Sequence, residues 1–270
     1  MDRVLSQGAM RAACIALPLF LLLCSSRDQS LIKDAEIGKY RSLYESSDWT
    51  VRKQAVAKAS RILTQEGTDL LLKATSDSHT LVRMEAISGL RRHKSPRARE
   101  RVREIIETTD DSNIRWQALK TMGYYREPTA ALLFAKNLKH DDWLIREESI
   151  KGLLKIDDYA IRYVSVPYII EALRDPSMSV KLTTLKYLRV TDPRIYSSLS
   201  AMLLSAENRR HALIQETLNA LKEYDLDAKT REKVIGYLTH QNRDIRLTAY
   251  RVLVAQNERD ENRKAPSRSR

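Results

Sequence analysis

Glycine, proline and cysteine are all scarce in this chain of 270 residues, with 7, 7 and 2 copies respectively. So few glycines argue against nucleotide-binding families that depend on glycine-rich phosphate loops, and neither G-x-G-x-x-G nor G-x-x-x-x-G-K-[ST] occurs. Both cysteines lie near the N-terminus, which excludes a disulfide framework and any C-x-x-C metal or redox site.

Catalytic motifs are also missing. The sequence contains neither H-E-x-x-H nor G-x-S-x-G. Its five histidines are too irregularly spaced to suggest a metal cluster. Asp-Asp pairs recur at connections between helices, where capping of the helix ends explains them. We therefore predict no catalytic residues, no metal and no cofactor.

The charge balance is strongly basic, with 47 Lys+Arg against 35 Asp+Glu and a formal net charge of +12. A charged fraction of 30% is too high for a polytopic membrane protein, and 43% hydrophobic residues is too many for a disordered chain. The length allows one or two domains with a sizeable core. The excess of basic residues raises the question of nucleic-acid binding, which charge alone cannot answer.

The first 26 residues have the pattern of an export signal. Residues 12–23 read AACIALPLFLLL, and Arg3 and Arg11 precede them. A helix of that length spans roughly 18 Å, short of the ~30 Å hydrocarbon core of a bilayer. Basic residues before a short apolar stretch are typical of a signal peptide, so we expect residues 1–26 to direct export.

The end of this stretch, Leu21-Leu22-Leu23-Cys24, resembles the lipobox of bacterial lipoproteins. That resemblance implies cleavage before Cys24 and attachment of a lipid to its thiol. Leu23 departs from the pattern, which usually has Gly, Ala or Ser at that position. Ordinary cleavage after Ser26 and an uncleaved anchor are the alternatives. Residues 27–30 form a short linker in all three cases.

A short sequence phrase recurs along the rest of the chain. It consists of an aliphatic residue, Arg, two variable residues, a small residue and a second aliphatic residue. Successive copies are 31, 32, 31, 35, 33 and 32 residues apart. Counting from the aliphatic anchor as zero, position +4 is small, and +5 and +8 are apolar except for Ala at the first +8. These positions share one broad face of a helix, so each phrase predicts the second, inner helix of a pair. The seven anchors are Val51, Val82, Ile114, Ile145, Val180, Leu213 and Ile245.

These copies resemble the HEAT repeat in the short form found in phycobilisome-lyase-type bacterial proteins, D-x-x-V-R-x-x-A-x-x-x-L. Asp48-Val51-Arg52-Ala55 fits well, whereas Ile214 replaces the arginine in the sixth copy. The resemblance implies an all-α solenoid of about seven helix pairs over residues 31–256, with one extended concave face. Residues 257–270 lose the pattern and are expected to form a mobile basic tail.

The basic residue at +1 lies inside the buried face, so it needs a partner. Aspartates in the turns of the same or the next repeat can supply charge-assisted hydrogen bonds. We expect this ladder to be structural; its members are Arg52, Arg83, Arg115, Arg146, Lys181 and Arg246.

Position +6 falls on the exposed side of the helix that should line the concave face. It holds lysine in three successive repeats, which predicts a row at roughly 10 Å intervals. Trp116 at +2 is the best aromatic candidate for a ligand contact. The alternative is an ordinary solvated helix face. The candidate binding residues are Lys120, Lys151, Lys186 and Arg251 at +6, with Arg91, Lys155 and Arg189 one turn later.

Together these features favour a non-enzymatic interaction protein of the bacterial envelope, exported and anchored by lipid on the periplasmic side of a membrane or at the cell surface. Its concave face would bind a protein or an anionic envelope component. The alternatives implied by the resemblance are a HEAT-like DNA glycosylase and a bilin-lyase-type enzyme. The export signal argues against both, and no specific nucleic-acid partner is expected.

Overall fold

A computed structural model describes residues 35–205 and 210–264 of the chain. These residues form helices only, with no strand among them, so the predicted all-α class is confirmed. The chain divides into two compact units, Met1–Arg101 and Val102–Arg270. The predicted export signal, Cys24 and the linker at 27–30 lie outside the described residues.

The first unit contains a helix over residues 35–44, followed by α2 (Trp49–Ala59), α3 (Gln65–Ala74) and α4 (Thr80–Leu90). Helix α5 (Pro96–Thr108) begins in this unit and ends in the second. The Asp48 side chain accepts a hydrogen bond from the Thr50 amide at 2.8 Å and so caps α2. Helix α2 packs against both α3 and α4, and this burial accounts for the apolar periodicity.

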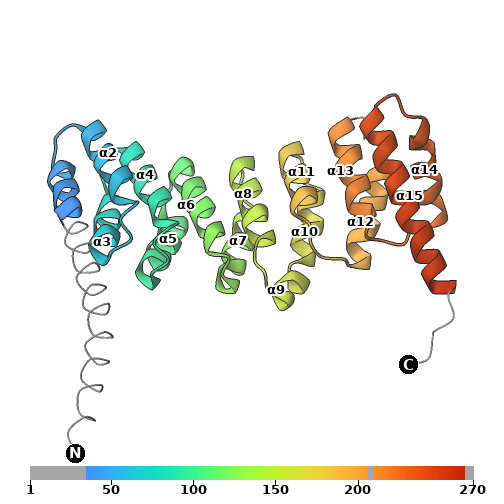
Figure 1. Cartoon of the computed structure of the whole chain (residues 1–270), viewed down its shortest axis with the longest axis horizontal. Coiled ribbons are helices and arrows are strands. Elements are labelled where there is room, and N and C mark those ends of the chain that lie inside the picture. Colours follow the sequence, from blue (N-terminus) through green and yellow to red (C-terminus); the bar gives the residue numbers. More distant parts are fainter. Residues whose placement is uncertain (1–34, 206–209, 265–270) are drawn as a thin grey trace, which may run out of the picture. The chain divides into compact units, whose positions relative to one another are not determined.

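The second unit is built from two layers of helices (Figure 1). In the first layer each helix packs against the next, and all of these helices carry the recurring phrase. The second layer packs beneath it, and its last three helices also contact one another in series. The first layer is α6 (Ser112–Tyr125), α8 (Trp143–Leu154), α11 (Met178–Tyr187), α13 (His211–Leu221) and α15 (Arg243–Lys264); the second is η1 (Pro128–Ala130) with α7 (Ala131–Asn137), α10 (Val166–Leu173), α12 (Pro193–Leu204), and α14 (Ala228–Gly236) with η2 (Tyr237–Thr239).

Glycine allows the close approach between helices α6 and α8. A Cβ at Gly123 would lie 3.5 Å from Cα of Gly152, and a Cβ at Gly152 would lie 2.3 Å from the Phe134 ring of α7. A side chain at Gly152 would therefore overlap Phe134, which is itself buried. These glycines fix how near the first-layer helices come at the centre of the unit.

One irregular spacing in the sequence has a structural cause. The 35 residues between the anchors Ile145 and Val180 contain an additional short helix, α9 (Tyr159–Val164), ahead of α10. Its N-cap Asp158 accepts a hydrogen bond from the Ile161 amide at 2.9 Å. The extra residues are thus accommodated outside the α8–α11 contact.

The expected boundary of the basic tail at residue 257 is wrong. Helix α15 continues to Lys264, well past the last apolar position of the repeat. The extension is held by its charges, because Arg259 donates to the Tyr224 carbonyl at 2.8 Å and pairs with Asp225 at 3.2 Å. Arg263 also pairs with Asp225. Across the part of the chain that the structure describes, no helix is both long and apolar enough to cross a bilayer.

Candidate binding face

Three of the predicted lysines lie together on α6 and at the end of α8. Nζ of Lys120 lies 4.7 Å from the centroid of the Trp116 ring, one helical turn away. Nζ of Lys155 lies 5.3 Å from the Tyr124 ring of α6 and 5.8 Å from the Tyr187 ring of α11. We call this group the basic–aromatic cluster; its members are Trp116, Lys120, Tyr124, Lys151, Lys155 and Tyr187. Cation–π contacts hold the ammonium groups over the faces of the rings.

Two glutamates on α8 limit which of these cations can meet a partner. Glu148 is buried and accepts a hydrogen bond from Nζ of Lys151 at 3.1 Å through Oε2, while its buried Oε1 has no hydrogen-bond partner among the described residues. Glu147 instead accepts hydrogen bonds from Ser179 at 2.8 Å and Thr183 at 2.7 Å, which joins α8 to α11. The charge of Lys151 is therefore paired with Glu148 inside the protein and not directed to a partner.

Lys155 lies near several other cations. Burial lowers its pKa, and the nearby charge of Lys151 lowers it further. Glu148 opposes this shift, whereas Arg126 and Lys120 reinforce it. Burial also tends to lower the pKa of Lys151, but the charge and hydrogen bond of Glu148 outweigh it and raise that pKa. An anion placed beside Lys155 would relieve the repulsion among these cations.

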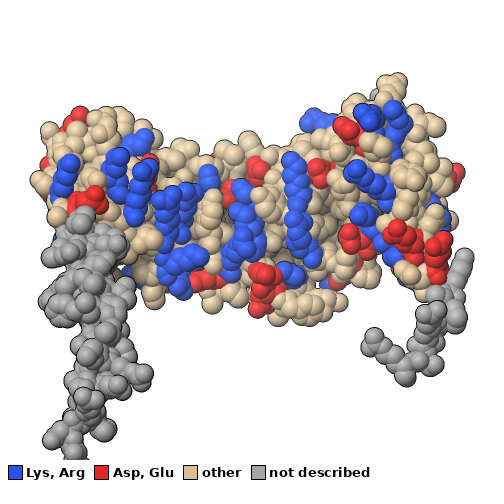
Figure 2. Space-filling view, in the orientation of Figure 1, with Lys and Arg blue, Asp and Glu red and all other residues tan. Residues whose placement is uncertain are grey.

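The remaining candidates lie elsewhere. Lys186 is exposed on α11 and shares a groove of about 390 Å³ with Arg189, Glu216 and Glu223, so that groove carries both signs of charge. Arg251 lies exposed on α15, and Arg91 belongs to the first unit. Figure 2 shows Lys and Arg side chains in bands over the part of the second unit that runs from α6 to α11. The predicted row thus resolves into the basic–aromatic cluster and a separate mixed groove.

The repeat pattern does not single out Tyr124 and Tyr187 from the other tyrosines. They occupy positions +10 and +7 of their repeats. At 100° per residue, +10 lies 40° from +6 on the helical wheel, whereas +7 lies 100° away. A search for aromatic residues beside the lysine positions would have found Tyr124 but not Tyr187.

The basic residues at +1 point into the turns between repeats. Nε and Nη2 of Arg146 donate to Asp175 at 2.7 and 2.9 Å, and its Nη1 donates to the carbonyls of His140 and Asp141. Arg52 makes the equivalent contacts in the first unit, with Asp77 and two carbonyls. The other arginines of the ladder donate hydrogen bonds to carbonyls in the turns; they are Arg83, Arg115 and Arg246. Lys181 instead lines a cavity beside α12.

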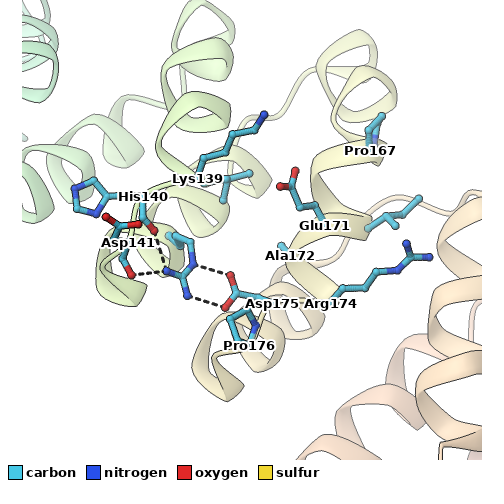
Figure 3. A pocket seen from close by; sticks show the side chains of 12 residues that line it. Lys139, His140, Asp141, Pro167, Glu171, Ala172, Arg174, Asp175 and Pro176 are labelled. Carbon is cyan, nitrogen blue, oxygen red and sulfur yellow. Dashed lines mark hydrogen bonds and ion pairs between the residues drawn. The ribbon is translucent and has the colours of Figure 1, made fainter.

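A cavity of about 630 Å³ opens beside the Arg146–Asp175 pair, between the end of α7 and α10. Figure 3 shows Asp175 and the residues His140 and Asp141 joined to the arginine by dashed bonds. Lys139, Glu171 and Arg174 also line this cavity, so it carries both signs of charge. It lies on the second-layer side and contains none of the predicted binding residues.

No group of three or more His, Cys, Asp or Glu side chains within the described ranges is arranged to hold a metal ion. The buried His93 has a structural role, because its ring nitrogens lie 2.9 Å from the Thr68 hydroxyl and 3.2 Å from the Ser60 carbonyl oxygen. The basic–aromatic cluster itself consists of three lysines and three aromatic residues.

Comparison with known proteins agrees with this fold. Residues 41–123 match the model of the HEAT-repeat family. No curated protein matches the sequence.

Three solved structures show the same arrangement of helices. YibA from Escherichia coli has a TM-score of 0.62 at 12% identity, over 89% of this chain and 93% of that one. An archaeal HEAT-like repeat protein from Thermococcus onnurineus NA1 has a TM-score of 0.52 at 17% identity, over 82% and 97%. The complex of CpcE and CpcF of phycocyanin lyase from Nostoc sp. PCC7120 gives 0.50 at 18% identity, over 84% and 94%.

At these identities the likenesses establish the fold alone. Residues 41–123 thus carry HEAT repeats, and the described chain has the all-α fold of HEAT-like repeat proteins.

Proposed function

We propose that this chain is a non-enzymatic binding protein of the bacterial cell envelope, exported and lipid-anchored through Cys24, and that its basic–aromatic cluster binds an acidic protein partner. The observation that carries the proposal is the position of Lys155, held between the rings of Tyr124 and Tyr187 and close to Lys120 and Lys151.

The energetics of Lys155 favour an anionic ligand. Its pKa is lowered by burial and by neighbouring cations, so the folded protein holds this charge at a cost when no ligand is present. A carboxylate from a partner would offset that cost. Aromatic side chains add contact area at little loss of conformational entropy, and they are enriched in protein interfaces.

A protein partner is favoured over a small molecule because the cluster spans three helices and is not enclosed. Tyr124 and Lys120 belong to α6, Lys151 and Lys155 to α8 and its end, and Tyr187 to α11. One of the solved structures with this fold is that of a complex between two proteins, CpcE and CpcF. Binding over such a surface depends on several modest contacts, of which a few dominate.

The cellular location rests on the sequence. Two arginines, the apolar stretch at 12–23 and Cys24 form the signal, and only residues 25–34 separate Cys24 from the first described helix. An anchored chain would hold its repeats close to the membrane, where basic residues are attracted to acidic head groups.

Capture from envelope fractions tests the binding face. The wild-type chain is compared with a variant carrying Lys120→Glu and Lys155→Glu. The matched control carries Lys136→Glu and Lys139→Glu, which change the net charge equally on the second-layer side. A partner retained by wild type and control but lost by the first variant supports the proposal. Equal capture by all three, or capture of nucleic acid alone, contradicts it.

Metabolic labelling tests the anchor separately. Wild type should incorporate labelled palmitate and partition into detergent, whereas Cys24→Ala should do neither. A chain found in the cytoplasm with residues 1–26 retained would overturn the proposed location.

A further inference from the structure

The side of the last repeat that faces away from α13 is apolar and exposed. Tyr250 of α15 is 60% exposed, and Leu247 of α15 and Ile235 of α14 are 42% and 50% exposed. We call these three residues the end face. The position of Tyr250 is buried in every earlier repeat, and the positions of Leu247 and Ile235 are each bonded to the following helix in one earlier repeat.

Tyr250 shows the difference most clearly. It is the +5 residue of its repeat, and the +5 residues of the six preceding copies are all buried. Five of those six have no exposed surface at all, and the sixth, Leu185, retains 6%; the six are Val56, Ile87, Leu119, Ile150, Leu185 and Leu218. A position that is elsewhere part of the core is open only in the last repeat.

Hydrogen bonds identify the other two positions. Glu147, at +2 of α8, bonds to Ser179 and Thr183 of the next first-layer helix, and Leu247 is the +2 residue of α15. Ser200, eight residues after the N-cap Asp192 of α12, bonds to Thr230 of the next second-layer helix at 2.6 Å. Ile235 likewise lies eight residues after the N-cap Asp227 of α14.

The described residues after this repeat, up to Lys264, do not supply a covering helix pair. In the preceding repeat, α13 ends at Leu221 and α14 begins at Ala228. In the last repeat α15 runs on unbroken to Lys264, past Asp260, the position equivalent to Ala228. The extension is instead tied back to Tyr224 and Asp225, which precede α14.

We infer that the end face is a homodimer interface, in which two copies of the chain stack through their last repeats about a two-fold axis. In the second unit each earlier first-layer helix packs against the next helix of the same kind, and a second copy of the chain offers such a helix. A two-fold contact needs a self-complementary surface.

The charges on α15 meet this requirement. Asp244 and Arg251 are both exposed, and they flank the apolar residues at equal sequence distances from a point between Leu247 and Thr248. In an antiparallel contact of α15 with its copy, Asp244 of each chain lies opposite Arg251 of the other. The apolar side chains then meet between two equivalent Asp244–Arg251 ion pairs that the two-fold axis relates.

Sedimentation equilibrium of the purified full chain, delipidated or with Cys24→Ser, tests this inference. At roughly 50 µM, wild type should have twice the mass of one chain, and Tyr250→Glu should weaken the association at least tenfold. Leu132→Glu, at another exposed leucine on α7, should associate like wild type. A monomeric wild type, or a Tyr250→Glu variant that associates normally, overturns the interface.

Charge exchange tests the pairing directly. Asp244→Arg and Arg251→Asp should each weaken association several-fold, and the double variant should restore it. Failure of the double variant to recover contradicts the two-fold arrangement. Circular dichroism of each variant checks that the helices remain formed, so loss of association is not confused with unfolding.

Discussion

Asp77 accepts hydrogen bonds from both Nε and Nη2 of Arg52 at 2.8 Å, although 25 residues separate them in sequence. The carboxylate also accepts a bond from the His79 amide at 2.8 Å. The pair therefore joins the second helix of one repeat to the turn of the next. Arg146 and Asp175 repeat the arrangement in the second unit.

Stability should depend on acid titration of Asp77. The hydrogen bonds from Arg52 lower its pKa to about 2, against the partial opposition of burial, from an ordinary value of 3.8. Because the folded pKa is depressed, this stabilisation is present above pH 4 and is lost as the pH falls towards 2. Asp77→Asn should lower the free energy of unfolding at pH 7 by about 2 kcal/mol, with the difference disappearing near pH 2.

Urea unfolding at pH 7, 4 and 2.5 measures this effect. Asp69→Asn is the control, because Asp69 pairs with Arg97 on the surface and should contribute little. A constant difference between wild type and Asp77→Asn across this range would contradict the account.

The planar guanidinium group of Arg146, which can donate several hydrogen bonds at once, should contribute more to stability than its positive charge alone. Arg146→Lys keeps the positive charge but cannot bond to both oxygens of Asp175 and to the carbonyls of His140 and Asp141 at once. We expect a loss of about 1–3 kcal/mol in the free energy of unfolding. Arg189→Lys, at an exposed position, should change stability by less than about 0.5 kcal/mol. Equal effects at the two sites would argue against a structural role for Arg146.

Lys151 should stabilise the fold through Glu148. Lys151→Met leaves the buried carboxylate without its cation and should cost about 3 kcal/mol. The double variant Lys151→Met with Glu148→Leu should recover most of that loss, because neither charge then remains. A double-mutant cycle by thermal or urea unfolding gives the coupling, and additive effects would show that the two side chains do not depend on each other.

Removing the charge of Lys155 should stabilise the fold, whereas removing that of Lys151 should destabilise it. Since burial and nearby cations lower its pKa, removing the charge with Lys155→Met should raise the free energy of unfolding by roughly 0.5–1 kcal/mol. The same change should weaken binding of the acidic partner at least tenfold. Loss of stability in Lys155→Met would show that its contacts with Tyr124 and Tyr187 outweigh the repulsion.

Much of the fold can be read from the sequence because every helix pair must bury the same face. The aspartates Asp48, Asp111 and Asp142 cap α2, α6 and α8 as their position before the phrase predicts. Asp77 and Asp175 each accept a hydrogen bond from the amide of the N-cap residue of the following helix, His79 and Ser177 respectively. Each of these aspartates also receives an arginine from the preceding helix of its layer, a contact set by packing between repeats.

The binding face is less accessible to sequence patterns. The +6 periodicity locates Lys120 and Lys151, but the burial of Glu148 depends on how closely α6 and α8 approach at Gly123 and Gly152. That contact decides that Lys151 is paired within the protein. The continuation of α15 past residue 256 is also invisible to the apolar pattern, because charged contacts hold it.

Titration of Trp116 fluorescence with a polyglutamate peptide is the most direct test of the proposed binding face. Trp49→Phe and Trp143→Phe leave Trp116, whose ring lies beneath Lys120, as the only reporter. The account predicts a saturable change that weakens with salt and loses at least tenfold in affinity in Lys120→Gln with Lys155→Gln. The matched pair Lys136→Gln with Lys139→Gln should bind like the parent. Equal affinity for the peptide in both pairs would contradict the proposal that the basic–aromatic cluster binds an acidic partner.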